Sequence, residues 1–330
     1  MEQHHIFTGN TRRLHLLYEK MKRKEPVSLV FLGASVTLGI RIEEKHQFPV
    51  IITKYFQDKY QNNQIVCHNH SEAGTPSLNG LYQSYFLLEK YAPDLIVIDY
   101  SINDQKNPPH RDAYESLIVK CSQLSTHPAI ITFFVKSLMG YTCAPQMSAI
   151  CRHYQIPYVN VGARLDEDLS KGVLQWEDYS YDNCHPAPTG HHYIAKCLIE
   201  LFEKTCQLPP MTEFIPQKEL FHNALAELSF LIPPGGKHIS LSPVTMEFSA
   251  KCSMLFICYI AGITMDYGNL DVIVDGKNLV CLSSFRIHEW ERPVQDILYL
   301  SKTAETHHIA LRPQAGSEQK LFPLLCLGIC

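Results

Sequence analysis

Short, uninterrupted apolar runs that alternate with amphipathic segments constrain the fold of this chain most. The runs are rich in strand-forming residues and are typical of strands buried on both faces. They lie at residues 27–33, 64–68, 93–99, 129–135 and 156–161. Helical periodicity falls between and around them, at residues 11–24, 48–60, 78–91, 111–125, 144–154 and 189–206. This alternation predicts an α/β fold with a doubly wound, mostly parallel five-stranded sheet and helices on both faces.

The pattern changes after residues 208–210, where helical periodicity fades. Short strand-like runs follow, at residues 238–248, 252–261, 270–274, 279–285, 307–311 and 321–327. Asp275-Gly276 stands between two of these runs and is a hairpin signal. A chain of 330 residues is also longer than one ordinary domain. We therefore predict an α/β domain over residues 1–208 and an all-β sandwich over residues 209–330.

Charge and hydropathy narrow the range of partners and locations. The formal net charge of −4 gives no electrostatic case for nucleic acid or an anionic membrane. No segment approaches the roughly 20 apolar residues that cross a bilayer, and the polar N-terminus lacks the apolar core of a signal peptide. The twelve cysteines form no CxxC pair, so we expect free thiols in a reducing compartment, the cytoplasm. A disulfide framework remains the alternative.

A serine lies just beyond the first buried run. The run ends at Gly33, Ser35 follows two residues later, and Gly39 comes next in the turn. Right-handed crossovers bring all strand-to-helix loops of such a sheet to one edge. A serine on a tight turn there can meet an acyl carbon as a nucleophile. The alternative is an ordinary turn that uses glycine for its backbone freedom.

Three other loops at the same predicted edge carry complementary groups. Gly74 follows the second strand, Asn103 follows the third, and Asp182 and His185 precede the last helix. A histidine can take the proton of Ser35, and an aspartate can orient that histidine. The backbone N–H groups of Ser35 and Gly74 and the amide of Asn103 can donate to an oxyanion. Asn103 alone would be read as a turn residue.

Together these segments resemble the motifs of the SGNH (GDSL-type) hydrolases, whose name lists four residues in this order. The resemblance covers residues 25–205 and rests on Gly33-Ala34-Ser35, Gly74, Ile102-Asn103-Asp104 and Asp182-x-x-His185-Pro186. The chain departs from the family at Ala34, where aspartate is usual, and at Ser101, where glycine is usual. Neither position carries a catalytic group. The resemblance implies a flavodoxin-like sheet and a serine esterase that needs no cofactor.

The order of domains refines the expected substrate. A hydrolase domain followed by a β-sandwich is similar to carbohydrate O-acetyl esterases that act on oligosaccharides. The resemblance therefore implies a small acylated substrate, an acetylated oligosaccharide, and leaves a homo-oligomer open. One alternative is a lipid or thioester acylhydrolase. Another is an inactive carbohydrate-binding or scaffold protein, against which the complete serine, histidine and aspartate set argues.

Two tryptophans are candidate sugar-stacking platforms, Trp176 and Trp290. Aromatic rings of this size are also major packing groups, and packing is the interpretation we favour for both.

Histidine and cysteine clusters raise the question of a metal. Cys67, His68 and His70 form one group, and His185, His191 and His192 form another. Neither spacing matches a standard zinc pattern, so we predict no metal. We expect His191 and His192 at the surface, on the first turns of the last helix.

Overall fold

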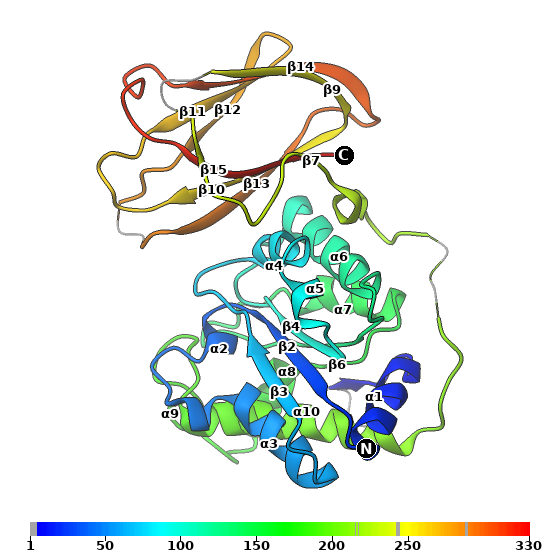
Figure 1. The fold of residues 1–330 in the computed structure, drawn as a ribbon. Coiled ribbons are helices and arrows are strands. Elements are labelled where there is room, and N and C mark those ends of the chain that lie inside the picture. The colour runs from blue at the N-terminus through cyan, green and yellow to red at the C-terminus, as the bar shows by residue number, and fades with distance from the viewer. Residues whose placement is uncertain (1–4, 215, 217, 242–244, 288–289) are drawn as a thin grey trace. The chain divides into compact units, whose positions relative to one another are not determined.

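The computed structural model describes residues 5–214, 216, 218–241, 245–287 and 290–330. The chain divides between Asn223 and Ala224 into two compact units. We call residues 1–223 the α/β unit and residues 224–330 the β unit, and each is described by itself (Figure 1). Within the described residues, no helix combines the length and the apolar character that a membrane crossing requires.

The α/β unit is built on a six-stranded sheet. Its strand order is β1-β6-β5-β4-β2-β3. The strands are β1 (Ile6–Phe7), β2 (Val27–Gly33), β3 (Ile65–Asn69), β4 (Leu95–Asp99), β5 (Ala129–Phe133) and β6 (Tyr158–Val159). The five predicted strands are parallel, which confirms the mostly parallel sheet. The sixth, β1, adds an antiparallel edge beside β6 and was not predicted.

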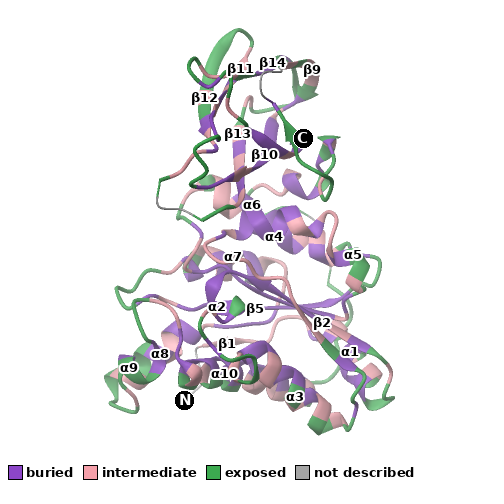
Figure 2. Ribbon diagram, turned by 60° about the vertical axis from the view of Figure 1, so that its left-hand side comes forward, coloured by how far each residue is buried: buried purple, intermediate pink, exposed green. Residues whose placement is uncertain are grey.

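Helices cover both faces of this sheet. They are α1 (Arg12–Lys22), α2 (Ser35–Leu38), α3 (Phe48–Tyr60), α4 (Ser77–Ser84), α5 (Leu88–Tyr91), α6 (Pro108–Ser122), α7 (Ala144–His153), α8 (Val161–Ser170), α9 (Trp176–Tyr179) and α10 (Pro188–Gln207). Helices α1, α3 and α10 share one apolar core with the sheet, and α4, α6 and α7 lie over the opposite face (Figures 1 and 2). Because helices cover both faces of the sheet, the central strands β4 and β5 are buried along their whole length.

Several predicted helix boundaries are wrong. The helix predicted over residues 78–91 is split into α4 and α5. Ser77 is the first residue of α4 rather than its N-cap, which is Pro76. The N-cap of α10 is Ala187, and Thr189 instead donates its hydroxyl hydrogen to a carbonyl of α9. Helices α2, α8 and α9 were not predicted; α2 and α9 have four residues each and carry little periodicity of their own.

The boundary between the units also lies later than the predicted position after residue 208. Glu115 of α6 is fully buried, and three consecutive backbone N–H groups donate to its carboxylate. They belong to Leu220, Phe221 and His222, at 2.6, 2.9 and 2.9 Å. The hydroxyl of Tyr154 adds a fourth hydrogen bond at 2.8 Å. A buried carboxylate needs such donors, so this segment is part of the α/β unit.

The β unit consists of two antiparallel sheets. Their orders are β13-β10-β15-β7, with β8 beside β15, and β12-β11-β14-β9. The strands are β7 (Ser229–Ile232), β8 (Ile239–Ser240), β9 (Met246–Cys252), β10 (Met254–Ala261), β11 (Asn269–Val274), β12 (Lys277–Ser283), β13 (Arg292–Tyr299), β14 (Glu305–Pro313) and β15 (Pro323–Ile329). Both sheets contribute to one apolar core, which confirms the all-β second domain.

Two details of the β unit bear on the sequence predictions. Asp275 and Gly276 join β11 to β12 with φ angles of +51° and +76°, as a tight hairpin turn requires. The predicted strand over residues 238–248 includes residues 242–244, which lie outside the described residues. Strands β7 and β13 were not predicted.

Candidate active site

Ser35 stands at the carboxyl end of β2, on a turn that only glycine allows. A Cβ atom at Gly33 would lie 2.2 Å from Oγ1 of Thr37 and 2.9 Å from the carbonyl oxygen of Asp99. The chain can therefore bend sharply against β4 and begin the short helix α2 at Ser35. Gly39 ends that helix with a φ of +75°. The turn holds Ser35 at the sheet edge with 7% of its surface exposed.

The loop before α10 brings two predicted side chains to this serine. The Nε2 atom of His185 lies 3.0 Å from Oγ of Ser35, and its Nδ1 atom lies 2.8 Å from Oδ2 of Asp182. A carboxylate only accepts hydrogen bonds, so the neutral ring carries its hydrogen on Nδ1. Nε2 is then free to accept the hydroxyl hydrogen of Ser35. The structure thus joins these three residues, from loops about 150 positions apart in the chain, in one hydrogen-bonded line.

The same loop sets the ionisation of both titratable groups. Partial burial opposes ionisation of Asp182, but the backbone N–H groups of Cys184 and His185 and the His185 ring outweigh it. They lower the pKa of Asp182 to about 2. The neighbouring Cys184 thiol has the largest influence on His185, and together with Asp182 it raises the pKa of that ring to about 9. The neutral fraction of His185 therefore increases as the pH approaches 9.

Hydrogen bonds from outside the motif fix this loop. The indole N–H of Trp176 donates to the carbonyl oxygen of Asp182 at 2.8 Å, and the hydroxyl of Ser180 donates to the carbonyl of His185 at 2.7 Å. Trp176 is only 8% exposed and belongs to the apolar core, which agrees with packing rather than a sugar platform. Its bond to Asp182 was missed, because no spacing rule connects a tryptophan to a loop six residues later.

The other two predicted residues lie on loops at the same sheet edge. The loop of Gly74 is tied to the end of β2 by a hydrogen bond from the backbone N–H of Glu72 to the carbonyl oxygen of Gly33, at 3.1 Å. Gly74 itself has a φ of +71°. Asn103 follows β4 and is half-buried, and the described residues offer its carboxamide no hydrogen-bond partner. Both residues thus remain candidate donors to a substrate.

Among the described residues, neither of the two groups of histidines considered as metal ligands in the sequence is brought together as a set of three ligands. His191 is 1% exposed, stacks on Phe48 and accepts a hydrogen bond from the backbone N–H of Phe48, so its predicted surface position is wrong. Burial lowers its pKa to about 4. His192 is exposed, as expected. The rings of His68, on β3, and His70, just after it, both pack against Tyr91, at centroid distances of 4.5 and 4.3 Å.

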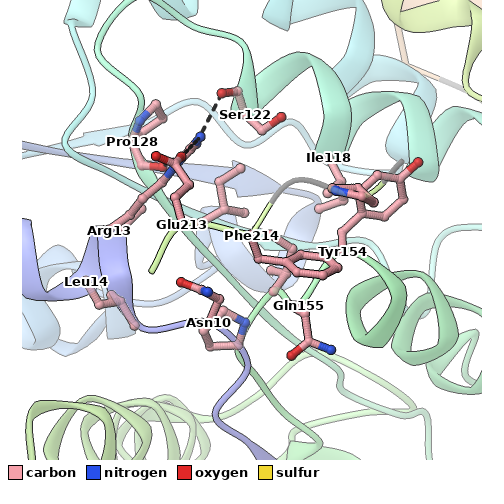
Figure 3. A pocket seen from close by; sticks show the side chains of 15 residues that line it. Asn10, Arg13, Leu14, Ile118, Ser122, Pro128, Tyr154, Gln155, Glu213 and Phe214 are labelled. Atoms are coloured by element: carbon pink, nitrogen blue, oxygen red, sulfur yellow. Dashed lines mark hydrogen bonds and ion pairs between the residues drawn. The ribbon is translucent and has the colours of Figure 1, made fainter. Parts of the chain in front are cut away.

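A cavity of about 100 Å³ lies elsewhere in the α/β unit (Figure 3). Its lining includes Ala129 at the start of β5 and Pro157 just before β6, so it faces the amino ends of these strands. Ser35 lies at the carboxyl end of its strand. Figure 3 shows Arg13 beside Glu213, and the two side chains form an ion pair at 2.7 Å. This cavity is therefore separate from the candidate active site.

Trp290, the remaining predicted residue, belongs to the β unit. Its side chain is 55% exposed, and the guanidinium carbon of Arg292 lies 5.9 Å from its ring centroid.

Known structures resemble the whole chain. A crystal structure of a two-domain esterase active on acetylated mannans matches with a TM-score of 0.82 and 18% identity, over 98% of this chain and 96% of that chain. The same esterase co-crystallised with mannopentaose matches with a TM-score of 0.82 and 17% identity, over the same shares. No protein-family model matches the chain, and no curated protein does. At these identities the likeness establishes the fold: the chain has the two-domain architecture of this esterase.

Proposed function

We propose that this protein is a serine esterase that removes a small acyl group, an acetyl group, from a carbohydrate hydroxyl. The observation that carries the proposal is the hydrogen-bonded line of Asp182, His185 and Ser35, with distances of 2.8 and 3.0 Å. A serine at a sheet edge whose hydroxyl meets a carboxylate-oriented histidine is the arrangement that acyl transfer requires.

Each group has a defined part in the proposed reaction. Ser35 attacks the ester carbonyl while His185 takes its proton, and Asp182 stabilises the resulting imidazolium. The backbone N–H groups of Ser35 and Gly74 and the carboxamide of Asn103 donate to the oxyanion. His185 then gives this proton to the leaving sugar oxygen, and it next activates the water that hydrolyses the acyl-enzyme. Every step uses side chains and backbone groups of the chain, with no cofactor.

The carbohydrate part of the proposal is supported by the fold of both units together. The esterase that matches almost the full length of this chain acts on acetylated mannans. An acetylated oligosaccharide is therefore the substrate class that we propose. We further propose the cytoplasm as the location, supported by the free thiols of all twelve cysteines.

Substitution of the proposed nucleophile tests the activity. We expect Ser35→Ala to fold normally and to hydrolyse neither an aryl acetate nor an acetylated mannooligosaccharide. A serine-directed phosphonate should label the native protein at Ser35 and leave the variant unlabelled. Ser148→Ala, on α7, is the matched control and should keep full activity.

The choice of ester separates the remaining candidate functions. Rapid turnover of short-chain and slow turnover of long-chain aryl esters is expected of an acetyl esterase, whereas the reverse order would indicate a lipid acylhydrolase. Normal turnover by Ser35→Ala would refute the proposed mechanism. A native protein that binds oligosaccharide but hydrolyses no ester would be a binding protein.

A further inference from the structure

We propose that Ser101 is a positioning residue for the reaction, because it anchors the loop that carries Asn103 to the segment that follows β5. This inference rests on the proposed function for its catalytic half and on the geometry alone for its structural half. Ser101 lies two residues after the end of β4 and two residues before Asn103. Its side chain is fully buried, so its hydroxyl must find its hydrogen-bond partners within the protein.

The hydroxyl of Ser101 continues the pairing between β4 and β5. The last backbone pair of that ladder joins Ile98 to Thr132, an offset of 34 residues, and Ser101 and Val135 have the same offset. The Ser101 hydroxyl donates to the carbonyl oxygen of Val135 at 3.0 Å and accepts from its backbone N–H at 2.8 Å. One side chain thus offers Val135 both the donor and the acceptor that a neighbouring strand would offer.

The backbone of Ser101 forms a corner of the turn that leads to Asn103. The backbone N–H of Asn103 donates to the carbonyl oxygen of Tyr100 at 3.0 Å, so Ser101 and Ile102 are the two central residues of this turn. The carbonyl oxygen of Ser101 accepts from the backbone N–H of Cys143 at 2.6 Å. The side chain and the carbonyl of Ser101 therefore both attach the turn to the segment that follows β5.

Asn103 depends on this turn, because no described residue holds its carboxamide by a hydrogen bond. A donor to an oxyanion stabilises the transition state when it is aimed before the charge develops. Loss of the Ser101 hydroxyl takes one partner from each backbone group of the buried Val135 and frees the turn on that side. The carboxamide then remains present but is displaced, and small displacements of catalytic groups slow a reaction strongly.

Hydrogen exchange measures the structural half without activity. In Ser101→Ala the backbone amide hydrogen of Asn103 should exchange at least about tenfold faster than in the native protein, because the turn that protects it has lost an anchor. Ser84→Ala is the matched control, since Ser84 on α4 is also buried and its hydroxyl donates to the carbonyl oxygen of Leu81 at 2.6 Å. This control should exchange at Asn103 as the native protein does.

Steady-state kinetics on an aryl acetate measures the catalytic half. Ser101→Ala should lower kcat roughly tenfold with little change in KM, which is less than the loss expected for Asn103→Ala, because the donor is displaced rather than removed. Ser84→Ala should keep the native kcat. Added to Asn103→Ala, the Ser101→Ala substitution should lower kcat by less than about twofold, because the group that Ser101 positions is already gone. A merely structural effect would be repeated in full in that background.

The outcomes separate this inference from the proposed function. Unchanged exchange at Asn103 in Ser101→Ala would overturn the anchor. Faster exchange with a native kcat, equal losses of kcat in both backgrounds, or a native kcat in Asn103→Ala would overturn the positioning role in the reaction. A native protein that hydrolyses no ester would instead refute the proposed function, while faster exchange in Ser101→Ala would still establish the anchor.

Discussion

The carboxylate of Asp104 accepts hydrogen bonds from both the backbone N–H and the hydroxyl of Ser77, each at 2.7 Å. Asp104 is 1% exposed and directly follows Asn103, while Ser77 lies three residues after Gly74. One buried carboxylate therefore ties together the two loops that carry the proposed oxyanion donors. Such charge-assisted bonds are short and hold their partners in register, so the donors are fixed before substrate arrives.

Asn103→Ala should slow the chemical step. If the carboxamide donates to the oxyanion, its loss should reduce kcat roughly 10²–10³-fold, about 3–4 kcal/mol, with little change in KM. Steady-state kinetics on an aryl acetate measures both constants. Asn107→Ala is the control, because it removes the N-cap of α6 and should lower stability by about 1 kcal/mol while sparing kcat. An effect of Asn103→Ala confined to KM would identify a substrate-binding residue.

Substitutions of His185 and Asp182 should differ in severity. His185→Ala removes the base and should abolish nearly all activity, whereas Asp182→Asn removes charge and orientation only and should lose less. In Asp182→Asn, the amide oxygen can still accept hydrogen bonds from the backbone N–H groups of Cys184 and His185. EDTA should not inactivate the native protein. Inactivation by EDTA that zinc reverses would contradict the assignment of His185 as a base.

Asp99 should make stability depend on pH. Burial raises the pKa of this carboxyl, which ends β4, to about 7, although the backbone N–H of Ser101 opposes the shift. The unfolded carboxyl ionises near pH 4, so the stabilising contribution is complete below that pH and is lost as the pH rises to about 7. Asp99→Asn keeps the acceptor for Ser101 and removes the titration.

We expect the stability of Asp99→Asn, relative to that of the native protein, to increase as the pH rises. The free energy of unfolding of Asp99→Asn minus that of the native protein should increase between pH 4 and pH 7 and stay constant above, with a total change of at most roughly 4 kcal/mol. Urea unfolding at several pH values measures it. Asp58→Asn, an exposed carboxylate on α3, should show a far smaller change. Parallel curves for Asp99→Asn and the native protein would mean that folding does not raise the pKa of Asp99.

Trp290→Ala tests a sugar platform in the β unit. A contact between the ring and a sugar would form with substrate and transition state alike, so its loss should raise KM for an acetylated oligosaccharide. Hydrolysis of a small aryl acetate should be unchanged, because that ester is too small to need a platform. The two assays are run beside a melting curve. A parallel loss on both substrates, or a lower melting temperature alone, would assign Trp290 to packing.

The parts of this fold that sequence could predict are those in which neighbouring residues determine the structure. The run from residue 27 to Gly33 indicated a buried strand, and the close approach of Thr37 explains why glycine ends it. The line from Ser35 to His185 followed from the parallel arrangement of strands, which places their loops at one edge.

The features that sequence could not predict depend on contacts between distant segments. The burial of His191 against Phe48, a residue 143 positions earlier in the chain, is set by tertiary packing. Strand β1 exists only because β6 offers it a partner. No local periodicity or composition of the sequence predicts these contacts.

The buried carboxylate of Glu115 limits how these two units could be exchanged between proteins. A gene fusion that joined a foreign module after residue 208 would discard the backbone donors of residues 220–222 and leave that charge unsatisfied within α6. A breakpoint between Asn223 and Ala224 keeps them. Recombination of this α/β unit with other partners should therefore carry the connecting segment along as part of the inherited module.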